Sequence, residues 1–140
     1  MKYITGIHAL NLNCCLMTTG DWHQSAIQWD TLHFKNTETA FFKDYGIEFN
    51  SSVPGHSGSF YVANHIRALL DMLYDKDFSN AQGMRKDYIG NDAYNQEIFN
   101  LVSQMKDLPQ WPSIDAFMEK EYRMQWIRFK EESKHGKVAV

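Results

Sequence analysis

The sequence predicts a mainly α-helical (α+β) domain: a helical bundle of three main helices plus short helices, with one or two short N-terminal β-strands. Three stretches from residue 59 onward repeat apolar residues at helical spacing. The alternation typical of strands is confined to the N-terminal third. The 140 residues, 44% of them hydrophobic, fit one globular domain. We expect it to span residues 1–135, with residues 136–140 as a frayed tail.

The N-terminal segment predicts a strand followed by a short helix. Within residues 3–16, Leu10 and Leu12 alternate with asparagines, as in a strand with one buried face. Asp21 follows a Thr-Thr-Gly break and is placed to cap a helix over about residues 22–29. Its carboxylate can accept hydrogen bonds from the free N–H groups of a first helical turn.

The next segment predicts another short helix and a second strand. The helix covers residues 38–45 and ends before Gly46, where a left-handed residue commonly terminates a helix. Residues 47–49 favour a short strand, although no turn signal indicates its pairing. Residues 51–59 contain a proline and two glycines and indicate an exposed loop.

The three main helices are expected at residues 59–74, 91–106 and 113–129. Each begins at a residue type that can cap a helix. Their apolar stripes must be buried, and packing the helices against one another is the simplest solution. The stripes consist of Val62, Ile66, Leu69, Leu70 and Leu73, of Tyr94, Ile98, Leu101, Val102 and Met105, and of Ile114, Phe117, Met118, Tyr122, Trp126 and Phe129.

Composition narrows the classes of function. The net charge of −3 shows no basic excess, so nucleic-acid binding is not favoured. The sequence has neither an apolar run of membrane-spanning length nor a signal-peptide pattern, so we expect no membrane association. Cys14 and Cys15 are adjacent, which predicts free thiols and a cytoplasmic location. The six histidines show no metal-binding spacing, and we expect neither a metal nor a cofactor.

The most suggestive segment for chemistry is residues 20–23, between the predicted strand and the predicted helix. A helix N-terminus binds anions readily, and a histidine beside it can donate to a phosphate or act as an acid or base. Asp21 and His23 are therefore candidate catalytic residues, together with His8 on the preceding strand. An ordinary helix cap with a surface histidine is the favoured interpretation.

Candidate anion-binding residues are Arg67, Asn64 and Arg85. Arg67 and Asn64 share a helix face beside an apolar stripe, where an arginine can bind a carboxylate or phosphate. Arg85 and Lys86 precede a predicted helix N-terminus and can form a small anion site. For Arg67 the favoured interpretation is a surface arginine with a partly buried stem. For Arg85 and Lys86 it is a solvated loop.

We expect first a small protein-interaction or regulatory module, antitoxin-like or immunity-like, with a protein partner or a homo-oligomer. Four tryptophans can act as interface anchors, and no complete catalytic constellation is evident. One alternative is a small enzyme or ligand-binding domain acting on an anionic, nucleotide-like molecule through His8, Asp21 and His23. The second alternative is nucleic-acid binding, because the last predicted helix interleaves basic and aromatic residues.

Overall fold

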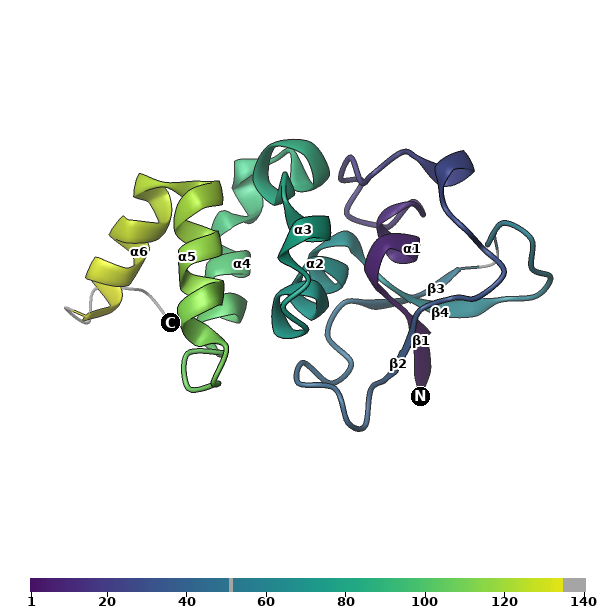
Figure 1. The fold of residues 1–140 in the computed structure, drawn as a ribbon, viewed down its shortest axis with the longest axis horizontal. Helices are drawn as coiled ribbons and strands as arrows, with labels where there is room; N and C mark the ends of the chain where they lie inside the picture. Colours follow the sequence, from purple (N-terminus) through teal and green to yellow (C-terminus); the bar gives the residue numbers. More distant parts are fainter. Residues whose placement is uncertain (51, 135–140) are drawn as a thin grey trace.

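The computed structural model describes residues 1–50 and 52–134, and its N-terminal part is built around a mixed β-sheet. Within these residues the sheet has four strands in the order β2-β1-β4-β3 (Figure 1). β1 pairs parallel with β4, whereas β1–β2 and β3–β4 are antiparallel. The strands are β1 (Lys2–Ile4), β2 (Phe34–Asn36), β3 (Ile47–Asn50) and β4 (Phe60–Ala63).

This sheet corrects the predicted fold class, because the protein is α+β rather than a helical bundle with one or two strands. The strand expected at residues 47–49 is present as β3. β2 was not predicted, since its three residues are too few to show an alternation. β4 was assigned to a helix because Val62 lies four residues before Ile66 and extends the helical stripe.

Helix α2 (His65–Tyr74) is the central element of the fold. It begins after Asn64, whose backbone is extended and whose Oδ1 accepts from the backbone N–H of Arg67 at 2.8 Å. Nine of its ten residues are buried. The sheet lies on one side of α2 and the C-terminal helices lie on the other (Figure 1). Because α2 is enclosed on all sides, its polar residues must find partners inside the protein.

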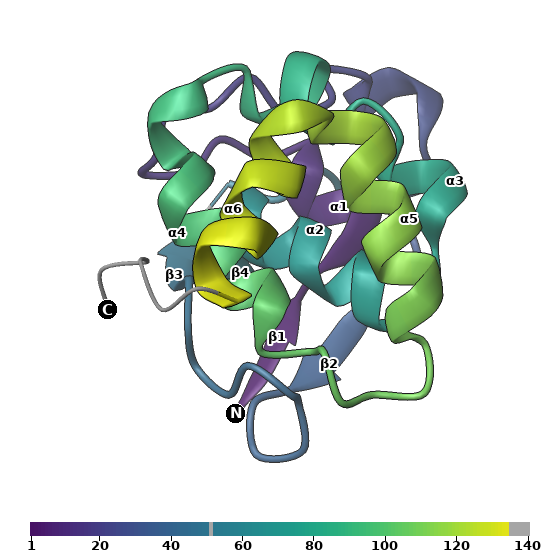
Figure 2. The same ribbon diagram turned by 90° about the vertical axis from the view of Figure 1, so that its left-hand side faces the viewer.

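Figure 2 views the molecule from the helical end, with the last helices nearest the reader. They surround an aromatic cluster in which the ring of Phe99 packs against Tyr122, Trp126 and Phe129 at centroid distances of 4.9 to 5.4 Å. The remaining elements are α1 (Gly6–Leu10), η1 (Gln24–Ala26), α3 (Phe78–Ala81), η2 (Met84–Ile89), η3 (Asp92–Tyr94), α4 (Asn95–Ser103), α5 (Trp111–Tyr122) and α6 (Met124–Lys134).

Several predicted boundaries in the N-terminal half are wrong. The strand expected over residues 3–16 is β1 followed by α1. The helix expected over residues 22–29 is only the single 3₁₀ turn η1, because Trp22 has a φ of +59° that no right-handed helix accepts. Residues 38–45 form successive turns instead of a helix.

The C-terminal half follows the prediction more closely, with two interruptions. The helix expected from residue 91 begins as η3 and continues as α4 to Ser103. The helix expected over residues 113–129 is divided into α5 and α6 at Arg123, whose φ of +57° and ψ of −129° break the helical path. The tail expected at residues 136–140 lies outside the described residues.

Candidate functional site

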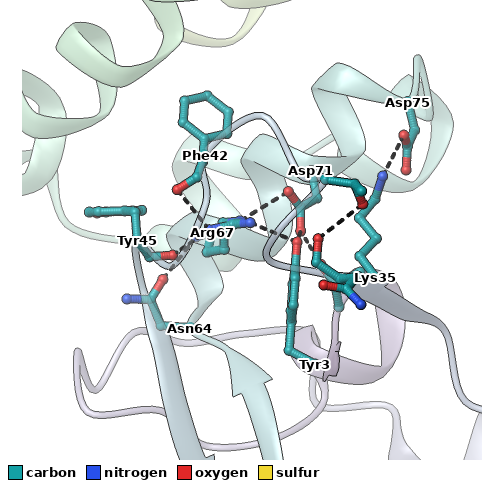
Figure 3. Close-up of polar contacts among 11 residues, drawn as sticks. Tyr3, Lys35, Phe42, Tyr45, Asn64, Arg67, Asp71 and Asp75 are labelled. Carbon is teal, nitrogen blue, oxygen red and sulfur yellow. Dashed lines mark hydrogen bonds and ion pairs between the residues drawn. The ribbon is translucent and has the colours of Figure 1, made fainter. Parts of the chain in front are cut away.

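Arg67, a predicted anion-binding residue, has no exposed surface. It lies in a buried polar network (Figure 3). Its Nε donates to Asp71 Oδ1 at 3.0 Å, and its Nη2 donates to the Tyr3 hydroxyl at 2.7 Å. Its Nη1 donates to the backbone carbonyls of Phe42 and Tyr45 at 3.3 and 2.6 Å. The guanidinium therefore uses protein acceptors and has no open side for a ligand.

The same network connects β1 to α2. Asp71 Oδ2 accepts from the hydroxyls of Tyr3 and Thr5, both at 2.7 Å. Burial and the neighbouring carboxylate of Asp71 raise the pKa of Tyr3 far above its usual range, so Tyr3 stays a neutral donor. Because Asn64 is the N-cap of α2, we assign Asn64 and Arg67 structural roles.

His8, a predicted catalytic residue, is held by the backbone of the following loop. Its Nδ1 accepts from the backbone N–H of His33 at 3.3 Å, which places the proton on Nε2. Nε2 then donates to the Gln28 carbonyl at 2.7 Å, and the ring lies 5.1 Å from that of Trp29. Both ring nitrogens are thus engaged, and the structure records no contact between His8 and either Asp21 or His23.

Asp21 and His23 do form a pair, and the element that follows them is only the three-residue 3₁₀ turn η1. Asp21 Oδ1 lies 2.8 Å from His23 Nδ1. Asn11 fixes the pair, because its Nδ2 donates to Asp21 Oδ2 at 3.0 Å and its Oδ1 accepts from the backbone N–H of His23 at 2.6 Å. The hydrogen bond to Asp21 and its negative charge raise the pKa of His23, whose side chain is 69% exposed.

The pair borders a cleft of about 470 Å³, here called the Trp22 cleft, which is lined by residues 19–23 and 86–88. Trp22 is 68% exposed and is held at a positive φ that an L-residue seldom adopts. The same tryptophan lines an adjoining hollow of about 340 Å³. A large ring held at the edge of two hollows offers a flat surface on which another planar group can stack.

A second cleft of about 280 Å³, here called the basic cleft, lies between η2 and the junction of α5 and α6. Its cationic side chains are Arg85, Lys86, Lys120 and Arg123, and its two carboxylates belong to Asp87 and Glu121.

Three of the four cations in the basic cleft are unpaired. Arg85 forms a two-point contact with Asp92 at 3.1 and 3.0 Å. The side chains of Lys86, Lys120 and Arg123 have no ion pair or hydrogen bond within the part of the chain that the structure describes. Unpaired exposed cations around a hollow are a favourable setting for an anion.

Two residues of η2, Lys86 and Asp87, line both clefts. This element is a π-helical turn in which the backbone N–H of Gly90 reaches the Arg85 carbonyl at 2.9 Å. Such turns are rare in proteins, and those that do occur are often found at functional sites. The sequence indicated the Arg85–Lys86 pair as an anion site. Lys120 and Arg123 belong to the last predicted helix, whose basic residues were considered only for nucleic-acid binding. Arg123 lies at the break between α5 and α6, where its φ is positive, and it lines the basic cleft.

Comparisons of the chain with models of protein families, with curated proteins and with solved structures find no match. Across residues 1–50 and 52–134 there is no group of three or more His, Cys, Asp or Glu side chains that could hold a metal ion. In the same ranges no helix has the length and apolar character to cross a bilayer.

Proposed function

We propose that this protein binds an anionic, nucleotide-like small molecule across the two clefts beside η2. The observation that carries the proposal is the position of Lys86, which joins an exposed stacking surface at Trp22 to the unpaired cations Lys120 and Arg123. A nucleotide combines a planar base with a phosphate chain, and these two parts require the two kinds of surface found here.

Each group has a distinct part in this binding. The base stacks on Trp22, a contact typically worth about 1–3 kcal/mol. The Asp21–His23 pair supplies an acceptor and a donor for sugar or base edges beside that ring. The phosphates lie against Lys86, Lys120 and Arg123, where charge attracts them and guides their approach. No activated nucleophile lines either cleft, so we propose binding rather than catalysis.

The expected protein-interaction module has weaker support from the surface. The four tryptophans do not share an exposed patch, because Trp126 is buried in the aromatic cluster and Trp22 lies by the clefts. A regulatory role is compatible with ligand binding, since a bound nucleotide can control contact with a partner. The unpaired thiols of Cys14 and Cys15 favour a reducing compartment such as the cytoplasm.

The test is isothermal titration calorimetry with ATP, AMP, adenosine and inorganic phosphate, and with a short single-stranded oligonucleotide. Trp22→Gly is the sharpest variant, because glycine adopts the positive φ at no steric cost and removes the ring without harming the fold. Loss of stacking should weaken ATP binding by about 5- to 150-fold. Lys86→Gln should weaken ATP more than adenosine.

Lys106→Gln is the matched control, since Lys106 is exposed and lines neither cleft. Its ATP affinity should equal that of the unaltered protein. Absence of binding to any of the five probes would reject the proposed function. Tight binding of the oligonucleotide alone, with an affinity that falls steeply with salt, would replace it with nucleic-acid binding.

A further inference from the structure

A second cluster, away from the two clefts, links a cysteine to a buried histidine. Cys14 lies on the loop after α1 and is partly exposed, whereas His65 is the first residue of α2 and is 1% exposed. Thr18 lies between them, with Oγ1 3.5 Å from Cys14 Sγ and 2.5 Å from His65 Nδ1. On its other side, His65 Nε2 lies 2.6 Å from the Leu12 carbonyl.

The direction of these hydrogen bonds follows from the carbonyl, which can only accept. His65 Nε2 therefore carries a proton, and in the neutral ring Nδ1 is the acceptor for the Thr18 hydroxyl. The oxygen of Thr18 then accepts the thiol proton of Cys14. Shifting one proton along each bond converts Cys14 to a thiolate and His65 to an imidazolium.

The packing around the ring keeps this relay in place. Gly20 lies so close that a Cβ there would approach His65 Cε1 to 2.8 Å and the Leu10 carbonyl to 2.5 Å. The loop that carries Cys14 and Thr18 can therefore close over His65 only because residue 20 has no side chain.

Electrostatics agrees with the geometry. Burial alone raises the pKa of Cys14, but hydrogen bonding to His65 and Thr18 outweighs it and lowers this pKa to about 7. Burial lowers the pKa of His65, whereas the hydrogen bond and charge of Cys14 raise it, with a net increase. The other titratable groups facing the cluster are Cys15 and Glu48. Glu48 raises the pKa of Cys15 to about 11, so the neighbouring thiol behaves in the opposite way.

We propose that Cys14 is a redox-reactive site that a hydroperoxide oxidises to a sulfenic acid, with Thr18 and His65 acting as its proton relay. The thiolate sulfur attacks the terminal peroxide oxygen, the O–O bond breaks, and the S–O bond forms. The sulfur is oxidised by two electrons, and the hydroperoxide is reduced to an alcohol, or to water if it is hydrogen peroxide. The proton held by His65 returns through Thr18 to the departing oxygen.

The relay favours a hydroperoxide over other thiol reagents because of the leaving group. An alkoxide or hydroxide is strongly basic and needs a proton as it departs, whereas a halide does not. Cys14 also has the two general properties of oxidation-sensitive cysteines, a lowered pKa and access to solvent. This site is independent of nucleotide binding, because Cys14 lines neither the Trp22 cleft nor the basic cleft.

The test compares two variants of the full chain that differ only in which thiol remains. Cys15→Ser keeps Cys14, and Cys14→Ser keeps Cys15. Each is exposed to hydrogen peroxide at pH 7 with dimedone, which traps sulfenic acids, and the adduct is followed by mass spectrometry. The pKa values of about 7 for Cys14 and about 11 for Cys15 give Cys14 far more thiolate at pH 7, although a thiolate of lower pKa is a weaker nucleophile. Taken together, the two effects predict that the Cys14 adduct forms about 50- to 100-fold faster than the Cys15 adduct.

The relay itself is tested in the Cys15→Ser background. Thr18→Val removes the bridging hydroxyl but keeps the shape of the side chain. Because burial alone raises the pKa of Cys14, this pKa should return to its ordinary value of 9.0 or above, and the adduct should form at least about fivefold more slowly at pH 7. Thr31→Val is the control, because Thr31 is exposed and the structure records no hydrogen bond to its hydroxyl. Circular dichroism verifies that each variant is folded.

Equal rates for the two thiols, or no effect of Thr18→Val in a folded protein, would overturn the proposal. If Thr18→Val fails to fold, the pH profile of iodoacetamide alkylation decides with Cys15→Ser alone. A midpoint near pH 7 supports the relay, and a midpoint near pH 9 rejects it.

Discussion

Replacing Asp71 by asparagine should destabilise the protein strongly, because it leaves the charge of Arg67 buried and uncompensated. Arg67 has no exposed surface and the Asp71 side chain is 6% exposed. Removing one member of such a pair typically costs about 3–5 kcal/mol. In the unaltered protein the hydroxyls of Tyr3 and Thr5 donate to the Asp71 carboxylate, whereas an asparagine can present N–H donors toward these hydroxyls instead. A loss of about 3–5 kcal/mol is a large part of the free energy of unfolding of a typical domain, about 5–15 kcal/mol.

Urea unfolding followed by circular dichroism measures the effect. With a denaturant slope of about 2 kcal/mol per molar urea, Asp71→Asn should lower the midpoint by about 1.5–2.5 M. Asp75→Asn is the matched control, because Asp75 forms a surface pair with Lys35 at 2.9 Å (Figure 3). Breaking that pair should cost about 0–1 kcal/mol. Equal losses in the two variants would refute the assignment of Asp71 as the buried counter-ion.

Three further predictions concern single positions. Arg123→Gly should raise the free energy of unfolding, measured in urea, by about 1 kcal/mol, because glycine accepts the positive φ at this position. It should also weaken ATP binding, because it removes a cation of the basic cleft. A lower stability would argue against the positive φ of residue 123. Gly20→Ala should lower the thermal midpoint and slow Cys14 oxidation, because its Cβ collides with His65; an unchanged protein would contradict the close approach. An NMR titration should give His23 a pKa above 6.5, and the substitution Asp21→Asn should bring this pKa back toward 6.5. The positive charge of His23, and any contribution it makes to anion binding, is therefore lost only as the pH rises through the raised pKa. A titration that Asp21→Asn leaves unchanged would exclude the pair.

The elements recovered from the sequence are those set by local apolar spacing. The stripe from Ile66 to Leu73 correctly located α2, and residues 47–49 were correctly assigned to the strand that is β3. The sheet was underestimated because its order is decided by pairs distant in sequence, such as Ile4 with Val62. A strand of three residues carries no period that a single sequence can show.

The functional residues show the same division between local and distant contacts. Asp21 and His23 were paired by proximity in the sequence, and the structure places their side chains in contact. The relay from Cys14 to His65 joins residues on α2 and on a loop about fifty positions earlier, and no short motif marks it. Arg67 was interpreted as partly exposed, because the enclosure of α2 on all sides depends on packing that the helical pattern does not contain.

The central place of β1 has a consequence for synthesis on the ribosome. β1 lies between β2 and β4. Its residue Tyr3 and the adjacent Thr5 reach Asp71 across 68 and 66 residues. The first strand therefore cannot complete its pairing until β4 has emerged, which takes on the order of ten seconds at usual elongation rates. Until then the edge of β1 that later pairs with β4 is open to pairing with other chains, a recognised route to aggregation. The C-terminal helices, whose contacts are local, can form as soon as they leave the tunnel.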